Sequence, residues 1–167
     1  MRIHVVLVEP EIPQNTGNIA RTCAAVGAQL HLVEPLGFSV SSREVRRAGL
    51  DYWDDVILHV HKSLDAFLDI HGDKDLRLFS TKASQVYSDI PLPEGSDVFL
   101  LFGKKTKGLP ESLIFQKMDF AARIPMAPGA RSLNLANSAA VVLYDLLRRL
   151  GFPNLTMKGS LKQEVMQ

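Results

Sequence analysis

The chain has 167 residues, of which 46% are apolar and 22% charged, a balance that is ordinary for a single soluble domain. It has no apolar run of about eighteen residues and no signal-peptide pattern at the N-terminus, so we expect a cytoplasmic protein without a membrane span. The net charge of +1 does not by itself indicate a nucleic-acid-binding protein, and the single cysteine excludes an intramolecular disulfide and a cysteine-based metal cage.

Strands and helices are expected to alternate along the chain. Apolar runs predict strands at residues 3–8, 30–33, 56–60, 76–80, 98–102 and 120–124. Apolar stripes of helical period predict a helix capped near Asn15 and ending at Gly27, helices at residues 42–49 and 64–70, a short helix after Pro110, and a last helix ending at Arg149. This order indicates an α/β fold with an open, mostly parallel sheet and helices on both faces. Residues 1–153 should form one domain and residues 154–167 a C-terminal tail.

The first loop of interest follows the first expected strand. Pro10 and Pro13 occupy the turn where a dinucleotide-binding enzyme has glycines, so an ordinary Rossmann enzyme is not expected. Further on, Arg21 lies half a turn away from the apolar stripe that holds Cys23, which should be a packed and inert thiol. A guanidinium fits phosphate oxygens, so Arg21 is a candidate phosphate ligand, with a surface salt bridge as the alternative.

The second loop, residues 103–108, follows a buried strand. Gly103 and Gly108 stand at its ends, which would let backbone approach a ligand closely, although a plain turn is an equal alternative. It is not a P-loop, because Leu109 and Pro110 replace the lysine and hydroxyl residue that hold phosphate and magnesium.

The third loop leads from Ile124 into the last helix. Ser132, Asn134 and Asn137 lie where the first helical turn leaves backbone N–H groups unpaired, so a polar ligand could bind there. The alternative is a helix whose own side chains cap it.

Other residues carry weaker signals. Arg43, Arg46 and Arg47 form one basic group, and Lys104, Lys105 and Lys107 form another; each is a candidate phosphate contact or simply a solvated surface. Tyr52 and Trp53 could stack on a base or pack in the protein. The five histidines have no known metal-binding spacing and are not expected to converge, so no metal is expected.

Taken together and in order, three strings resemble the motifs of the SpoU branch of the SPOUT RNA methyltransferases. They are Asn15 to Arg21, Phe102-Gly103 to Gly108-Leu109-Pro110, and Ile124-Pro125-Met126 to Ser132-Leu133-Asn134-Leu135. Residues 9–18, 36–38 and 47–52 are similar to the subgroup that methylates the wobble nucleotide of tRNA. One position departs from the pattern, because Lys105 stands where the second motif usually has an acid.

The resemblance implies a C-terminal trefoil knot and a homodimer, with S-adenosylmethionine bound at Thr81, Gly103, Ile124, Ser132 and Leu133. It also implies 2′-O-methylation of cytidine or uridine at position 34 of tRNA, without a metal, DNA or a membrane. Arg21 would lie near the partner subunit's cofactor and stabilise the developing alkoxide, with Asn15 holding the arginine and Ser132 and Asn134 ordering the cofactor or ribose. The two basic groups would contact the tRNA. The alternatives are a non-catalytic RNA-binding dimer, in which Lys105 replaces the acid, and a nucleoside-binding module without an RNA partner.

Overall fold

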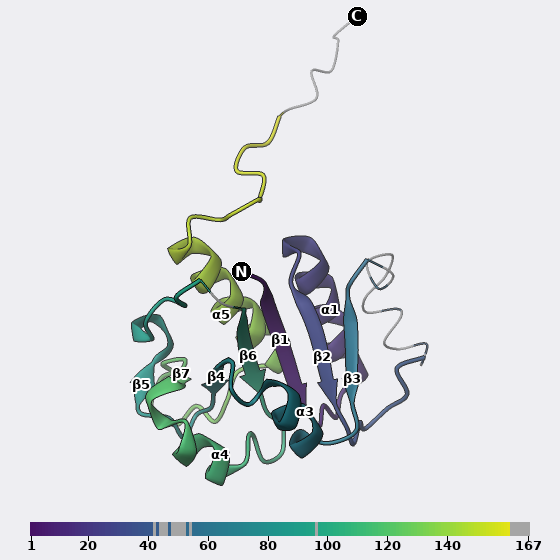
Figure 1. The fold of residues 1–167 in the computed structure, drawn as a ribbon, viewed down its shortest axis with the longest axis vertical. Helices are drawn as coiled ribbons and strands as arrows, with labels where there is room; N and C mark the ends of the chain where they lie inside the picture. Colours follow the sequence, from purple (N-terminus) through teal and green to yellow (C-terminus); the bar gives the residue numbers. More distant parts are fainter. Residues whose placement is uncertain (42, 44–46, 48–52, 54, 96, 161–167) are drawn as a thin grey trace, which may run out of the picture.

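The computed structural model describes residues 1–41, 43, 47, 53, 55–95 and 97–160. Within these residues, seven strands form one sheet in the order β3-β2-β1-β6-β4-β7-β5, and every pairing between neighbours is parallel (Figure 1). The strands are β1 (Ile3–Val8), β2 (Gln29–Val33), β3 (Leu58–His61), β4 (Asp75–Phe79), β5 (Gln85–Val86), β6 (Val98–Phe102) and β7 (Ala121–Arg123). The predicted parallel α/β fold is confirmed, although the short strand β5 was not expected.

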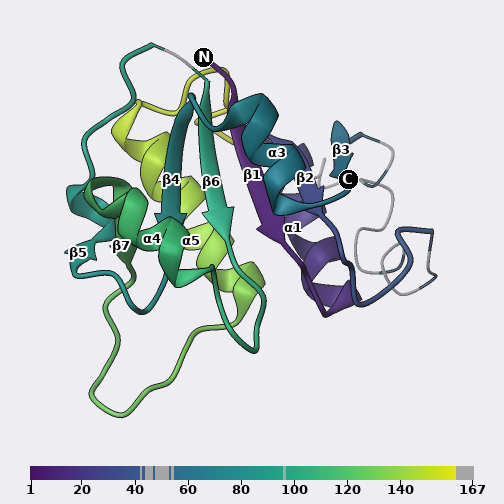
Figure 2. The ribbon, with the colours of Figure 1, turned by 60° about the horizontal axis from the view of Figure 1, so that its bottom comes forward.

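Helices cover both faces of the sheet, as predicted. α1 (Pro13–Val26) and α5 (Leu135–Arg149) pack on one face, whereas α3 (Leu64–His71) and α4 (Glu111–Gln116) pack on the other (Figure 2). Two 3₁₀ helices, η2 (Tyr87–Asp89) and η3 (Met118–Phe120), complete the described elements. Alternate side chains of β1 enter the two apolar layers, Val5 on the α1 side and Val6 on the α3 side. Because both faces are buried, every residue of β1 except His4 is apolar.

The first helix begins earlier than predicted. α1 starts at Pro13, no side chain caps it, and Asn15, Thr16 and Gly17 are buried inside it. The prediction of a cap near Asn15 is therefore wrong, because proline already suits the first helical position. Gly27 ends the helix at a left-handed φ of 71°, as expected.

Two further predictions have different outcomes. Burial of Cys23 raises the pKa of its thiol to about 12, which agrees with a packed, inert side chain. Most of the predicted helix at residues 42–49, including Arg46, lies outside the described residues. Residues 48–52, part of the string 47–52 that is similar to the wobble-methylating subgroup, also lie outside them. No helix in the described part of the chain has the length and hydropathy needed to cross a membrane.

The five histidines lie together, which contradicts the prediction. His4 comes from β1, His31 from β2, His59 and His61 from β3, and His71 from the end of α3. The ring centroid of His31 lies 5.0 Å from that of His4, 4.4 Å from His59, 5.2 Å from His61 and 5.5 Å from His71. The parallel register sets His31 directly beside His59. Distance along the sequence cannot reveal this convergence, because it depends on which strands are neighbours.

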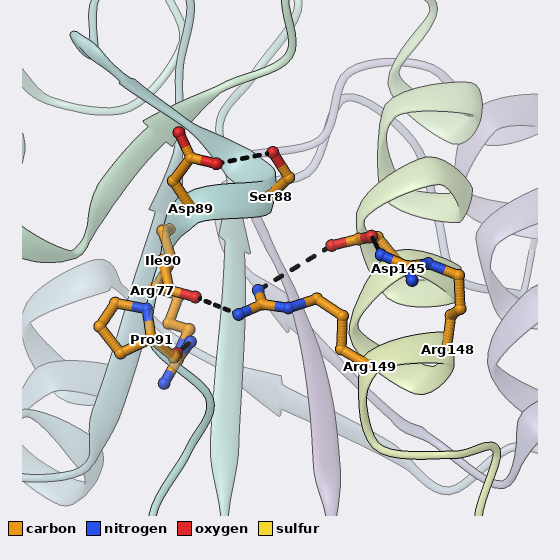
Figure 3. Close-up of polar contacts among 8 residues, drawn as sticks. All are labelled: Arg77, Ser88, Asp89, Ile90, Pro91, Asp145, Arg148 and Arg149. Carbon is orange, nitrogen blue, oxygen red and sulfur yellow. Dashed lines mark hydrogen bonds and ion pairs between the residues drawn. The ribbon is translucent and has the colours of Figure 1, made fainter.

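Two arginines fix the segment between β5 and β6. Arg77 on β4 is only 4% exposed; it donates from Nε and Nη2 to the two carboxylate oxygens of Asp75, at 2.9 Å each, and from Nη1 to the Pro91 carbonyl. Figure 3 shows Arg149 reaching from α5 to the Ile90 carbonyl, at 2.8 Å. The segment is thereby tied to both the sheet and α5.

We predict that Asp75→Ala lowers the free energy of unfolding by about 3 kcal/mol, because it leaves the buried Arg77 guanidinium without its carboxylate. Urea denaturation measures this change. Asp73→Ala is the control, since Asp73 is an exposed carboxylate paired with Lys74, and its unfolding midpoint should match that of the native chain. Equal effects of the two substitutions would contradict the importance of the buried pair.

Candidate active site

A cleft of about 1510 Å³ opens at the carboxyl ends of β1, β4, β6 and β7. Figure 2 shows the loops that follow these strands gathered beyond the arrowheads. The lining residues include all the predicted cofactor contacts, namely Thr81, Gly103, Ile124, Ser132 and Leu133. Three loops that are distant in sequence thus meet in one place, as expected for ligand sites of open α/β sheets.

The loop at residues 103–108 folds tightly back on itself. The backbone N–H of Gly108 donates to the Lys104 carbonyl at 2.8 Å, and Gly108 has a φ of 71°. A Cβ atom on Gly103 would lie 2.0 Å from the carbonyl carbon of Gly108 and 2.2 Å from the nitrogen of Leu109. The two glycines are therefore required first by the shape of the loop itself.

Two glutamates from the loop after β1 hold this folded loop. The ammonium of Lys104 pairs with the carboxylate of Glu9. Thr106 donates to the Glu11 carboxylate from its backbone N–H at 3.2 Å and from its hydroxyl at 2.9 Å. The loop after β1 and the second motif are thereby fixed against each other by Glu9 and Glu11, which lie in the similar string 9–18 but were not chosen as site residues. Their place directly after a buried strand was the available signal.

The anchoring separates the three lysines of this loop. Lys104 is half-buried and points to Glu9, whereas Lys105 and Lys107 are exposed. All three line the cleft. The ion pair makes Lys104 a structural residue of the loop, whereas Lys105 and Lys107 remain exposed to solvent.

Asn15 and Asn134 meet at the cleft. The amide of Asn134 donates from Nδ2 to Oδ1 of Asn15, at 3.0 Å. The Oδ1 atom of Asn134 accepts from the backbone N–H groups of Ala136 at 2.9 Å and of Asn137 at 3.3 Å. A side-chain cap thus takes these two N–H groups. The alternative of a self-capped helix is correct for this turn.

Other predicted site residues lie around or away from the cleft. Ser132 and Leu133 are exposed on its lining, which suits contact with a ligand. Arg21 is exposed on α1 and is not among the residues that line the cleft of its own chain. Arg43 and Arg47 are exposed, and neither lines the cleft. One chain therefore gathers the predicted cofactor contacts but not the predicted catalytic arginine.

We predict that Gly103→Ala lowers the free energy of unfolding by about 2 kcal/mol, because the new methyl group would overlap backbone that cannot move independently. Thermal unfolding should show a decrease of several degrees. Gly159→Ala adds the same methyl group where nothing lies within 4 Å, and it should be neutral. A Gly103→Ala protein as stable as the Gly159→Ala protein would contradict the close packing of the loop.

The chain is similar to known RNA methyltransferases along most of its length. The model of the SpoU rRNA Methylase family matches residues 2–144. The putative tRNA (cytidine(34)-2′-O)-methyltransferase of Geobacillus stearothermophilus is 45% identical over 157 residues, which cover 93% of this chain and 100% of that protein. The tRNA (cytidine(34)-2′-O)-methyltransferase of Escherichia coli K12 is 40% identical over 157 residues, covering 93% of this chain and 99% of that protein.

Solved structures agree with the sequence relatives. A structure described as giving insights into the 2-OH methylation of C/U34 on tRNA superposes with a TM-score of 0.83 and 43% identity, covering 90% of this chain and 97% of that one. The AdoMet-bound rRNA methyltransferase from Sinorhizobium meliloti superposes with a TM-score of 0.81 and 28% identity, covering 89% of this chain and 57% of that one. The folded core, the cleft and the matched residues lead to one conclusion: the chain belongs to the SpoU RNA methylase family.

Proposed function

We propose that this protein transfers a methyl group from S-adenosylmethionine to the ribose 2′-hydroxyl of nucleotide 34 of tRNA, a cytidine or uridine. The observation that carries the proposal is the cleft in which the second and third motifs meet beside Asn15 of the first. The curated relatives with the same reaction in their names extend over nearly the whole chain, which supports the same substrate here. The proposal includes a cytoplasmic location, in keeping with a tRNA substrate.

The residues of the cleft fit the cofactor. Leu109, Ile124 and Leu133 offer an apolar wall for the adenine, while Thr81 and Ser132 offer hydroxyl groups for the polar parts. When bound, S-adenosylmethionine supplies an electrophilic methyl group on a sulfonium ion. The cleft volume of about 1510 Å³ exceeds the common range for a single small ligand, about 300–1,000 Å³, and so leaves room for a nucleotide as well.

Arg21 serves the cleft of the partner subunit in a homodimer. Its exposure, and its absence from the lining of its own cleft, support this placement. Its guanidinium hardly releases a proton in proteins, so it does not act as the base. It holds a backbone phosphate of the tRNA and stabilises the alkoxide that develops at the 2′ oxygen. Asn15 and Asn134, which bond to each other, keep the cleft and the start of α5 in order.

The proposal includes a C-terminal trefoil knot. It also includes a surface of this protein that binds the tRNA. Lys105 and Lys107 at the cleft, with Arg43 and Arg47 outside it, are exposed cations that suit phosphate contacts. Lys105 occupies the place of the usual acid and contributes to RNA affinity, so binding of tRNA should weaken with rising salt.

We predict that the native chain transfers label from S-adenosylmethionine to unmodified tRNA and that nucleoside digestion finds the label in a 2′-O-methylated nucleotide 34. Lys105→Glu should keep this product but raise the KM for tRNA, because it replaces a cation near phosphate with an anion. Label in neither protein, with salt-sensitive tRNA binding retained, would favour the non-catalytic RNA-binding dimer instead. Cofactor binding without tRNA retention would indicate a nucleoside-binding module.

We predict that Arg21→Ala lowers kcat about 100-fold or more and leaves the Kd for S-adenosylmethionine nearly unchanged, because the guanidinium acts on the transition state. Single-turnover kinetics and equilibrium dialysis separate the two quantities. Arg21→Lys keeps the charge but loses the forked geometry, and it should recover only part of the rate. Loss of cofactor affinity with an unchanged kcat would overturn the assigned role.

We predict that the Arg21→Ala variant also reveals whether the protein acts as a homodimer. Leu133→Arg places a cation in the cleft lining against a cationic cofactor and should inactivate the cleft of its own chain. Mixed dimers of Arg21→Ala and Leu133→Arg chains should regain activity, because one of their two clefts has both an intact lining and an intact partner arginine. If Arg21 acts within its own chain, the mixture should stay as inactive as either variant alone.

A further inference from the structure

The histidine cluster has the composition and placement of a metal site. One ring nitrogen each of His31, His61 and His71 lie within 4.8 Å of one another. His31 is 2% exposed, while His61 and His71 are half-buried, so the group has one buried member and a side open to solvent. We propose that His31, His61 and His71 bind a divalent transition-metal ion, of which zinc is the natural example, at a site separate from the methyl-transfer cleft.

The distances suit such an ion. Nδ1 of His31 lies 2.9 Å from Nε2 of His61. Two imidazole nitrogens that bind one tetrahedral zinc ion at about 2.0–2.1 Å are about 3.3 Å apart, so this pair needs to open by only a few tenths of an ångström. His61 and His71 stand at the end of β3 and at the end of α3, where side-chain rotation can supply the movement. The ion would replace the proton between His31 and His61.

His4 and Asp97, which lie behind His31, support the same metal site. Nε2 of His31 lies 2.9 Å from Nδ1 of His4. Nε2 of His4 is buried, has no hydrogen-bond partner among the described residues, and lies 3.7 Å from the Asp97 carboxylate. A hydrogen bond from the backbone N–H of Arg2 holds the pKa of Asp97 below its usual value, so this carboxylate is charged.

The nitrogen that binds the metal determines which ring nitrogens of His31 and His4 carry protons. A metal on Nδ1 of His31 leaves its proton on Nε2, from where it is donated to Nδ1 of His4. His4 then carries its own proton on Nε2, which faces Asp97. Metal-binding histidines commonly donate their second N–H to such a partner. The chain from His31 through His4 to Asp97 gives a reason for the otherwise unpaired nitrogen of His4.

Aromatic packing is the competing account, and it explains only part of the cluster. His4 stacks on Phe99 with ring centroids 4.2 Å apart, which accounts for its burial. Packing does not require nitrogen atoms of the half-buried His61 and His71 to face His31. An ion there would link the edge strand β3 and the end of α3 to β2, and thus act as a structural clip.

Calorimetric titration of the full-length, metal-stripped protein without a histidine tag tests the proposal. ZnCl₂ should bind with one ion per chain and raise the unfolding temperature, whereas MgCl₂ should do neither, because imidazole ligands favour zinc over magnesium. His71→Gln should weaken zinc binding more than tenfold. His59→Gln is the matched control, since His59 is exposed and hydrogen-bonded to Gln29, and it should keep native affinity.

His4→Phe keeps a ring against Phe99 but removes the acceptor behind His31, and it should weaken zinc binding about 10–100-fold. Bound Co²⁺ should give the intense visible absorption of a tetrahedral site in the native chain and lose it in His71→Gln. Circular dichroism checks that each variant is folded. No saturable zinc binding, or equal losses in His59→Gln and His71→Gln, would overturn the proposal and leave a packed aromatic cluster.

Discussion

The parallel direction of all the described strands is the constraint on which the rest of the molecule depends. It puts the carboxyl ends of β1, β4, β6 and β7 at the same end of the sheet. The loops that follow these strands therefore meet, although they are far apart in sequence. Helices on both faces bury the strands and leave this end of the sheet open. The cleft is therefore a consequence of strand direction and of which strands are neighbours.

Polar contacts between side chains then fix the loops around the cleft. Glu9 and Glu11 hold the folded loop of the second motif, and Asn15 bonds to the residue that caps α5. The glutamates join the loop after β1 to the second motif, and Asn15 joins the first motif to the third. A change in one of these loops should therefore alter the others.

The sequence predicts the alternating elements and the cleft residues well, because apolar periodicity and loop chemistry are local properties. It predicts the start of α1 less well, since Pro13 competes with the cap signal of Asn15. The cap that Asn134 places on α5, and its bond to Asn15, could not be read from the sequence, because a residue 119 positions away supplies the partner. The histidine cluster was missed because strand order, not spacing, brings His31 beside His59 and His61.

Hydrogen–deuterium exchange with and without S-adenosylmethionine tests the central claim most directly, because it locates the bound cofactor without assuming a reaction. The account predicts slower exchange in residues 103–109, Ile124, Met126 and residues 132–134, which line the cleft, and little change around the histidine cluster. Saturating cofactor that protects a different part of the chain, or no part of it, would contradict the assignment of this cleft.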